Sequence, residues 1–162
     1  MTDSVCIKKL NANEKLLYKE DLILLFRELS CSAEHSLNYY IDYPENYAIF
    51  GLFISEDNLI GCAIIEDQGI HLTLYNLVIN KTFQNRGYGK ILLSHIELML
   101  TREFKSLGVK ELDMMLSCKY EVINFYLKNG YKEISKINRV IVSEGEDVYQ
   151  EELILIKHLI AV

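Results

Sequence analysis

The segment from residue 84 to residue 90 reads Gln84-Asn85-Arg86-Gly87-Tyr88-Gly89-Lys90. It lies between a predicted strand and a long predicted helix. Glycines at the start of a helix let the backbone approach a ligand closely. The free amides of a helix N-terminus and the helix dipole both favour an anion such as phosphate. The segment therefore predicts a phosphate-binding turn, with a purely structural tight turn as the alternative.

Two well-known phosphate-binding motifs do not fit this segment. A Walker A loop needs a glycine where Gln84 stands, and a serine or threonine where Ile91 stands. A Rossmann fingerprint needs a third glycine where Leu92 stands. What remains is a short loop with two glycines opening a helix, to which Arg86 and Lys90 add positive charge.

The strand that precedes this loop changes its hydrophobic phase. Ile70, Leu72 and Leu74 alternate with polar residues, but the apolar residues after them are Leu77 and Ile79. Because side chains alternate faces with a period of two, such a slip needs an extra residue in the strand. The pattern predicts a β-bulge near Tyr75–Asn76. A strand buried on both faces is the alternative.

Hydrophobic periodicity predicts strands and helices along the whole chain. Strands are expected at residues 4–10, 47–54, 59–65, 70–80, 111–116, 131–142 and 148–159. Helices are expected at residues 13–29, 32–40, 85–107 and 119–128. The first helix is capped by Asn11 or Asn13, and Gly108 ends the third. This order predicts the α/β (α+β) class, with a central sheet covered by helices.

Length and composition indicate one globular domain spanning residues 1–162. Of the 162 residues, 50% are hydrophobic and 25% are charged, which excludes a disordered protein. No apolar run approaches the roughly 20 residues that a membrane-spanning helix needs. The first residues, Met1 to Ser4, lack the pattern of a signal peptide. A cytoplasmic location and no membrane partner are therefore expected.

The net charge of the chain and the spacing of its cysteines and histidines argue against nucleic-acid binding and against a metal site. The net charge is −6 and no basic block is present, so nucleic acid is not an expected partner. An acidic excess is compatible with a cationic substrate, although it also serves solubility. The cysteines and histidines lack the spacing of a metal site, so no metal is expected: Cys6, Cys31, Cys62, Cys118, His35, His71, His95 and His158.

Two short motifs resemble the markers of the GNAT acyltransferase superfamily. The pattern Gln84-x-x-Gly87-x-Gly89 after a bulged strand resembles its acetyl-CoA signature. The segment from Phe125 to Tyr131, Phe-Tyr-Leu-Lys-Asn-Gly-Tyr, resembles its second marker. The predicted order of elements matches from residue 4 to residue 159. The resemblance implies a single-domain GNAT-like fold with a mixed central sheet of about seven strands, helices on both faces and a bulged, splayed fourth strand.

The same resemblance implies that acetyl-CoA is the cofactor. Backbone amides from Asn85 to Lys90 would hold its pyrophosphate. The main chain of residues 77–79 would pair with the pantetheine arm in the manner of an added strand. The residues implied in cofactor binding are Leu77, Val78, Ile79, Gln84, Asn85, Arg86, Gly87, Tyr88, Gly89 and Lys90.

Tyr126 stands where many relatives place the tyrosine that protonates the departing thiolate. A phenol with a pKa of about 10 can donate to a thiolate whose acid has a pKa of about 8.5. The alternative is an aromatic side chain packed in the core. One position departs from the family pattern, because many relatives carry an asparagine where Lys119 stands.

No general base is assigned. Many relatives carry a glutamate on the bulged strand, where this chain has Thr73 and Tyr75. Others carry a glutamate on the next strand, where Met114 stands, and neighbouring Asp113 is expected to face the other way. The remaining candidates for relaying the proton through water are Tyr75, His71 and Glu66.

The predicted function is transfer of an acetyl group from acetyl-CoA to a primary amine of a small molecule, by direct attack on the thioester. An amide such as that of Leu77 would hold the oxyanion. Specificity is expected from residues 30–46, whose Tyr39, Tyr40 and Tyr43 could bind a cation or simply pack against the sheet. Two alternatives remain: acetylation of a protein N-terminus or lysine, and a non-catalytic module that binds acyl-CoA. A homodimer is left open.

Overall fold

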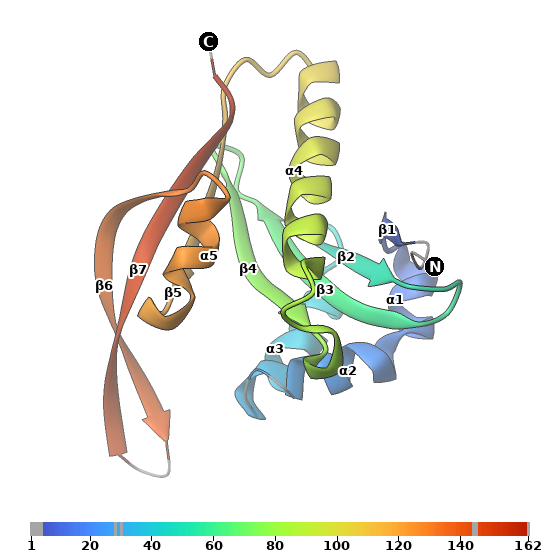
Figure 1. Cartoon of the computed structure of the whole chain (residues 1–162), viewed down its shortest axis with the longest axis horizontal. Coiled ribbons are helices and arrows are strands. Elements are labelled where there is room, and N and C mark those ends of the chain that lie inside the picture. The colour runs from blue at the N-terminus through green and yellow to red at the C-terminus, as the bar shows by residue number, and fades with distance from the viewer. Residues whose placement is uncertain (1–4, 28, 30, 144–145, 162) are drawn as a thin grey trace.

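Seven strands form one mixed sheet with helices on both faces (Figure 1). The computed structural model describes residues 5–27, 29, 31–143 and 146–161. Ser4, Glu28 and Ser30, which three of the predicted segments include, lie outside these residues. The strand order is β1-β2-β3-β4-β5-β7-β6. The strands are β1 (Cys6–Lys9), β2 (Tyr47–Phe53), β3 (Leu59–Asp67), β4 (Leu72–Ile79), β5 (Leu112–Cys118), β6 (Lys132–Ser143) and β7 (Glu146–Ile160).

Two apolar cores, one on each face, hold the helices against the sheet. The helices are α1 (Ala12–Leu17), α2 (Lys19–Arg27), α3 (Cys31–Asp42), α4 (Tyr88–Ser106) and α5 (Ile123–Lys128), with 3₁₀ turns η1 (Lys81–Phe83) and η2 (Tyr120–Val122). Leu92 and Ile96 of α4 lie in the core of one face, which α5 also covers. Leu22, Phe26 and Leu37 of α2 and α3 lie in the core of the other face. The sheet is therefore covered on both sides, as predicted.

The predicted bulge in β4 is confirmed. Asn76 pairs with Ile64, but the next residue of β3, Ile65, pairs with Leu74, so Tyr75 is the extra residue. On its other side β4 pairs in parallel with β5 only from Leu72 to Leu74. Beyond this point the two strands diverge (Figure 1). The fourth strand is thus both bulged and splayed, and one edge of its second half has no neighbouring strand among the described residues.

The predicted helix at residues 13–29 is two helices that meet at Tyr18. The ring of Tyr18 is buried, 5.0 Å from that of Phe53, and its hydroxyl donates to Asp57 (3.3 Å). Contacts distant in sequence thus fix the bend, which periodicity cannot show. Of the two predicted caps, Asn11 is the N-cap and forms a capping box with Glu14.

The predicted helix at residues 85–107 begins three residues later, at Tyr88. Asn85 and Gly87 have φ angles of 59° and 85°, which no right-handed helix contains. The predicted helix at residues 119–128 begins as the 3₁₀ turn η2 before α5. Both corrections fall at the turns that lead into a helix.

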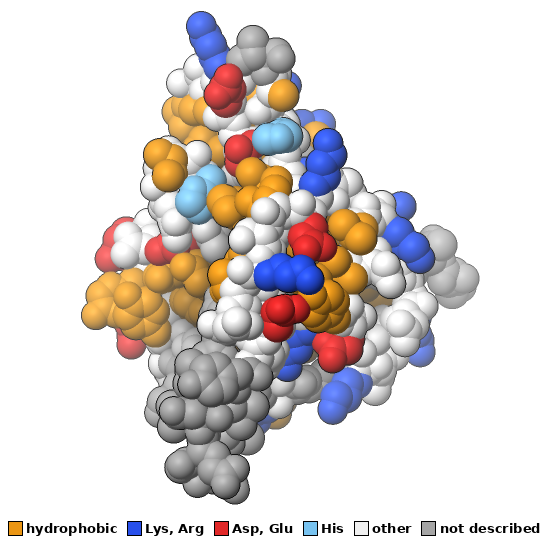
Figure 2. Space-filling view, turned by 90° about the vertical axis from the view of Figure 1, so that its left-hand side faces the viewer, with side chains coloured by type: hydrophobic (Ala, Val, Ile, Leu, Met, Phe, Trp, Pro, Cys, Tyr) orange, Lys and Arg blue, Asp and Glu red, His pale blue; other side chains and the backbone are white. Residues whose placement is uncertain are grey.

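The face on the side of β6 and β7 carries basic side chains scattered among acidic ones, with apolar side chains between them (Figure 2). Lys136 and Glu151, one on each strand, form such an exposed pair at 3.8 Å. Across the described residues, none of the helices has the length and apolar character that crossing a membrane requires.

Candidate active site

The free edge of β4 begins where β4 and β5 separate. The amide of Asn80 donates to the carbonyl of Ile60 on β3 (2.8 Å). Backbone groups in an antiparallel ladder point alternately to the two edges of a strand, so those of Leu77 and Ile79 point away from β3. No strand among the described residues pairs with them on that side. Val78 directs its backbone groups to β3, which narrows the predicted pantetheine-binding edge to Leu77 and Ile79.

Side chains of the loop after β4 fold back onto its backbone. The side-chain amide of Gln84 donates to the carbonyl of Ile79 (2.8 Å). The side-chain oxygen of Asn80 accepts from the amide (3.0 Å) and the hydroxyl (2.7 Å) of Thr82. Gln84 therefore fixes the loop itself, and the exposed residues after it lead to α4.

The N-terminus of α4 carries no side-chain cap. Its N-cap residue is Gly87, and no side chain bonds to the first amides of the helix. Helix geometry leaves these amides without intrahelical partners. A Cβ at Gly87 would meet no atom within 4 Å, so the space around this residue is open. With exposed Lys90 in the first turn and Arg86 over the ring of Phe83 (5.7 Å), this end of α4 fits a pyrophosphate.

Tyr126 lies on α5, which packs against the first turn of α4. A Cβ at Gly89 would lie 3.5 Å from the ring of Phe125, so the two helices approach closely here. The ring of Tyr126 packs edge-on against those of Phe125 (5.0 Å) and Tyr131 (5.7 Å). Its hydroxyl has no hydrogen-bond partner in the described parts of the chain. Burial, with a smaller effect of Cys118, raises the pKa of Tyr126 well above its ordinary value, so the hydroxyl keeps its proton.

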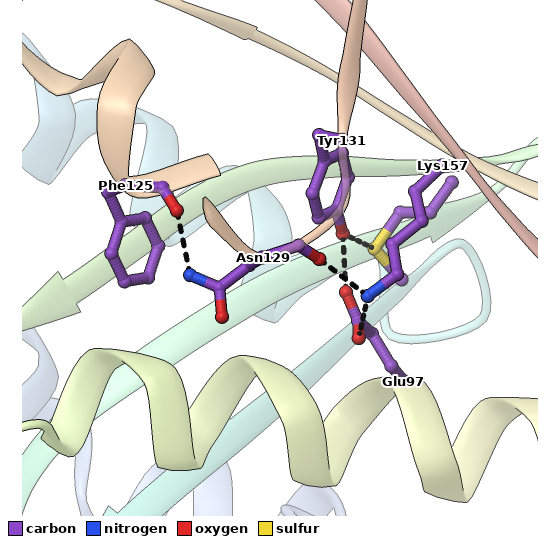
Figure 3. A network of polar contacts seen from close by, with 6 residues as sticks. Glu97, Phe125, Asn129, Tyr131 and Lys157 are labelled. Atoms are coloured by element: carbon purple, nitrogen blue, oxygen red, sulfur yellow. Dashed lines mark hydrogen bonds and ion pairs between the residues drawn. The ribbon is translucent and has the colours of Figure 1, made fainter. Parts of the chain in front are cut away.

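A polar network fixes the turn between α5 and β6 (Figure 3). The hydroxyl of Tyr131 donates to Glu97 on α4 (2.9 Å). The ammonium group of Lys157 on β7 donates to Glu97 (2.6 Å) and to the carbonyl of Asn129 (2.8 Å). The side-chain amide of Asn129 donates to the carbonyl of Phe125 (2.7 Å). The network joins α4, β7 and the C-terminal end of α5, and so fixes the position of α5.

Glu66, at the end of β3, accepts hydrogen bonds from neutral donors. The hydroxyl of Tyr75 donates to its carboxylate (2.8 Å), and so does the side-chain amide of Gln68 (2.7 Å). The bonds from Gln68, Tyr75 and Tyr47, with the nearby His71, lower the pKa of Glu66. Burial and the bond to Glu66 raise the pKa of Tyr75 to about 12. The candidate proton relays therefore lie together, with Glu66 ionised and Tyr75 protonated at neutral pH.

Five tyrosine rings form one cluster on the α3 side of the sheet. The closest ring centroids are those of Tyr39 and Tyr43 (4.6 Å) and of Tyr40 and Tyr47 (4.8 Å). The ring of Tyr75 lies 5.9 Å from that of Tyr40 and 6.0 Å from that of Tyr47. We call this set the tyrosine cluster. The predicted specificity segment at residues 30–46 is mostly the helix α3, and it contributes three of the rings.

Tyr47 and Asn76 belong to this site but were not among the predicted site residues. Tyr47 pairs with Glu66 across the β2–β3 hairpin, and the register of that hairpin was the signal that could have found it. The side-chain oxygen of Asn76 is buried without a hydrogen-bond partner. Its place beside the bulge was the only sequence signal for Asn76.

Three residues singled out from the sequence offer no base to this site. Lys119 is exposed and precedes η2. Met114 is fully buried, and its sulfur lies 3.1 Å from the hydroxyl of Tyr131. Asp113 is bonded to the ring of His158 on β7 (2.5 Å). Within the described ranges, no group of three or more histidine, cysteine, aspartate or glutamate residues could hold a metal ion.

Solved acetyltransferases share this fold at low sequence identity. The ribosomal-protein-S18-alanine N-acetyltransferase from Escherichia coli aligns with a TM-score of 0.73 and 18% identity, covering 98% of this chain and 96% of that one. A GNAT family acetyltransferase from Elizabethkingia anophelis with acetyl-CoA bound has a TM-score of 0.68, 16% identity and 99% coverage of each chain. An aminoglycoside 6'-N-acetyltransferase complexed with coenzyme A has a TM-score of 0.70 and 17% identity, covering 97% and 98%.

A comparison with curated proteins found no significant match. A family model described as "Acetyltransferase (GNAT) domain" matches residues 46–133. The matched segment includes the free edge of β4, the uncapped N-terminus of α4 and Tyr126 on α5. The chain therefore belongs to the GNAT acetyltransferase family.

Proposed function

We propose that this acetyltransferase, whose acetyl donor is acetyl-CoA, delivers the acetyl group to a primary amine of a small molecule by direct attack. The observation that carries the proposal is the free edge of β4 at the bulge. The helices α4 and α5 lie on one face of the sheet at this point, and the tyrosine cluster lies on the other. The two substrates would therefore reach the same strand from opposite faces.

Residues on the α4 face fit acetyl-CoA. The amides at the start of α4, with Lys90, would bind its pyrophosphate. The backbone groups of Leu77 and the amide of Ile79 would bond the pantetheine arm as a neighbouring strand does, because the carbonyl of Ile79 already accepts from Gln84. Acetyl-CoA supplies an acetyl group activated as a thioester.

The remaining residues would manage the charge and the protons of the transfer. The amide of Leu77 would stabilise the negative charge on the acetyl oxygen as the amine nitrogen bonds to the carbonyl carbon. When the carbon–sulfur bond breaks, the hydroxyl of Tyr126 would give its proton to the thiolate and regain one from water. The proton lost by the amine would pass to water on the acceptor side of the site.

A small amine is favoured by the acceptor side of the site, where ionised Glu66 and aromatic rings attract a cation. The aminoglycoside 6'-N-acetyltransferase, which acts on a small molecule, shares the fold. The ribosomal-protein-S18-alanine N-acetyltransferase, which acts on a protein, shares it too. This makes a protein N-terminus the second candidate acceptor.

Release of the coenzyme A thiol tests the proposal. The protein would be incubated with acetyl-CoA and, separately, with small primary amines, aminoglycosides and peptides that carry only an α-amino group or only a lysine. Mass spectrometry would identify the acetylated products. Thiol release with small amines and not with peptides is the expected result. Release with the α-amino peptides alone would replace the small amine by a protein N-terminus, and binding of acetyl-CoA without release would contradict catalysis.

A further inference from the structure

We propose that the tyrosine cluster and Glu66 bind a second, non-reacting positive charge of the acceptor, so that the preferred acceptor is a diamine or polyamine. This inference rests on the proposed function. One amino group of the acceptor would react beside Leu77. A second, cationic group of the same acceptor would bind to the tyrosine rings and to the carboxylate of Glu66.

The first argument is the exposure of the rings. Tyr39, Tyr43 and Tyr75 keep 50%, 45% and 42% of their surface exposed, whereas Tyr47 is 7% exposed. Packing against the sheet explains Tyr47 but leaves the other three rings on the surface. Exposed aromatic faces that adjoin one another attract ammonium groups, most strongly when several rings share the same cation.

The second argument is the charge of Glu66. Its carboxylate accepts hydrogen bonds from Tyr75 and Gln68, which are neutral, and no lysine or arginine among the described residues forms an ion pair with it. In the part of the chain that the structure describes, no ion pair with lysine or arginine therefore cancels the negative charge, and of the histidines only His71 lies near enough to help lower the pKa of Glu66. Because Tyr75 belongs both to the cluster and to the carboxylate's hydrogen bonds, rings and charge form one site.

The third argument is the unpaired oxygen of Asn76. This acceptor is buried beside the bulge without a donor, and an unsatisfied buried acceptor is costly. Asn76 pairs with Ile64, whose side chain belongs to the same core as Tyr47, so both lie on the same face of the sheet. An N–H group of the reacting amine would supply the missing bond.

The order of residues along β4 then sets the spacing of the two cationic groups. Tyr75, Asn76 and Leu77 are consecutive, and an extended chain advances roughly 3.3 Å per residue. The charge at Tyr75 and the reaction at Leu77 are therefore separated by a few carbon atoms of acceptor. A short diamine fits this spacing, whereas a monoamine occupies only one end.

Binding of an unreactive cation tests the site without catalysis. The probe is tetramethylammonium, and neopentyl alcohol is its uncharged counterpart of the same shape. The chain has no tryptophan, so near-ultraviolet difference spectra report on its tyrosines. Glu66→Gln removes the charge from the site. Glu56→Gln removes the same charge from the exposed turn at the other end of the β2–β3 hairpin and serves as the control.

We expect tetramethylammonium to bind the wild-type protein and Glu56→Gln, and to bind Glu66→Gln about tenfold more weakly or worse. Neopentyl alcohol should bind all three weakly. Equal binding of the two probes, or unchanged binding to Glu66→Gln, would overturn the proposed site.

Kinetics then connect the site with the acceptor. We expect 1,4-diaminobutane to be acetylated with a higher kcat/KM than butylamine, and Glu66→Gln to remove the difference mainly by raising KM for the diamine. An equal fall of kcat for both amines would instead make Glu66 a proton acceptor and overturn the role in binding. If tetramethylammonium binds as expected but no amine is acetylated, the proposed function fails while the cation site stands.

Discussion

The side chain of Tyr126 is half-buried, and its hydroxyl is protonated and without a hydrogen-bond partner among the described residues. If it is the general acid, Tyr126→Phe keeps the ring packing but removes the proton that the thiolate needs. We expect kcat to fall by about 100-fold with the affinity for acetyl-CoA unchanged. Because no hydrogen bond is lost, the free energy of unfolding should change by less than about 1 kcal/mol. Steady-state kinetics, calorimetry and urea unfolding measure the three quantities.

The matched control is Tyr120→Phe, which removes the exposed hydroxyl that bonds Glu151. It should leave kcat near the wild-type value. The raised pKa of Tyr126 also means that an alkaline fall in kcat, set by loss of its proton, lies above the ordinary tyrosine value of about 10. Wild-type kcat in folded Tyr126→Phe would exclude it as the acid.

Gly87 permits a conformation that other residues adopt only with strain. Gly87→Ala places a Cβ at φ 85°, in the open space before α4. The strain should cost about 1 kcal/mol of stability. If the backbone here binds pyrophosphate, the Kd for acetyl-CoA should also rise by roughly tenfold.

Gly69→Ala is the control, because Gly69 has φ 80° and equally open surroundings in the turn before β4. It should lose similar stability without changing the Kd measured by calorimetry. An equal Kd for both variants would show that the start of α4 does not bind acetyl-CoA.

At the scale of elements, the Glu97–Lys157–Tyr131 network joins α4, β7 and the end of α5. Glu97→Leu leaves the partly buried ammonium group of Lys157 without its carboxylate. We expect the free energy of unfolding to fall by about 3 kcal/mol in urea denaturation. The double variant Glu97→Leu/Lys157→Met should recover much of this loss, because no uncompensated charge remains.

Glu103→Gln is the control on the same helix. It breaks an exposed pair with Lys9 at 3.9 Å, which should cost less than about 1 kcal/mol. If the two single variants lost the same stability, the network would be no more important to α5 than a surface pair.

The elements with strict periodicity are those that the sequence predicts well. The phase slip between Leu74 and Leu77 placed the bulge near Tyr75–Asn76, and the pairing of β3 with β4 makes Tyr75 the extra residue. The bend at Tyr18 was missed, because it depends on Phe53 and Asp57, which are distant in sequence. Within the site, the motifs predicted the loop and strand residues. Tyr47 was not predicted, because its place beside Glu66 depends on the register of the β2–β3 hairpin, which periodicity alone does not specify.

At the scale of the whole molecule, the hydrogen bonds to two carboxylates predict an acid-sensitive stability. The bonds from Lys8 and the amide of Asn11 lower the pKa of Glu14, and those from Gln68 and tyrosines lower that of Glu66. A lowered pKa stabilises the folded state above the unfolded pKa, near 4.5, and this contribution is lost as the pH falls through the folded pKa. We expect the free energy of unfolding to decline below about pH 4.5.

Glu14→Gln and Glu66→Gln should each make this decline shallower in urea denaturation measured from pH 7 to pH 3. The pKa of Lys8 is raised, so its contribution is present below 10.5 and is lost only as the pH rises above that value. A stability that did not change between pH 5 and pH 3 would contradict the assigned hydrogen bonds.

The splayed sheet gives the molecule two separate approaches to one strand. Helices α4 and α5 lie on the face proposed for acetyl-CoA, and the tyrosine cluster lies on the face proposed for the acceptor. In the proposed function both substrates would meet at the free edge of β4, so that direct transfer would need no residue of the protein to carry the acetyl group.

Intact-mass spectrometry of a single turnover tests this claim most directly. The enzyme would be mixed with a small deficit of acetyl-CoA, first alone and then with 1,4-diaminobutane. Direct attack predicts no acetylated protein in the first mixture, and loss of the thioester with one acetyl-diamine formed per coenzyme A thiol in the second. Acetylated protein that forms without the diamine and disappears when the diamine is added would contradict direct attack.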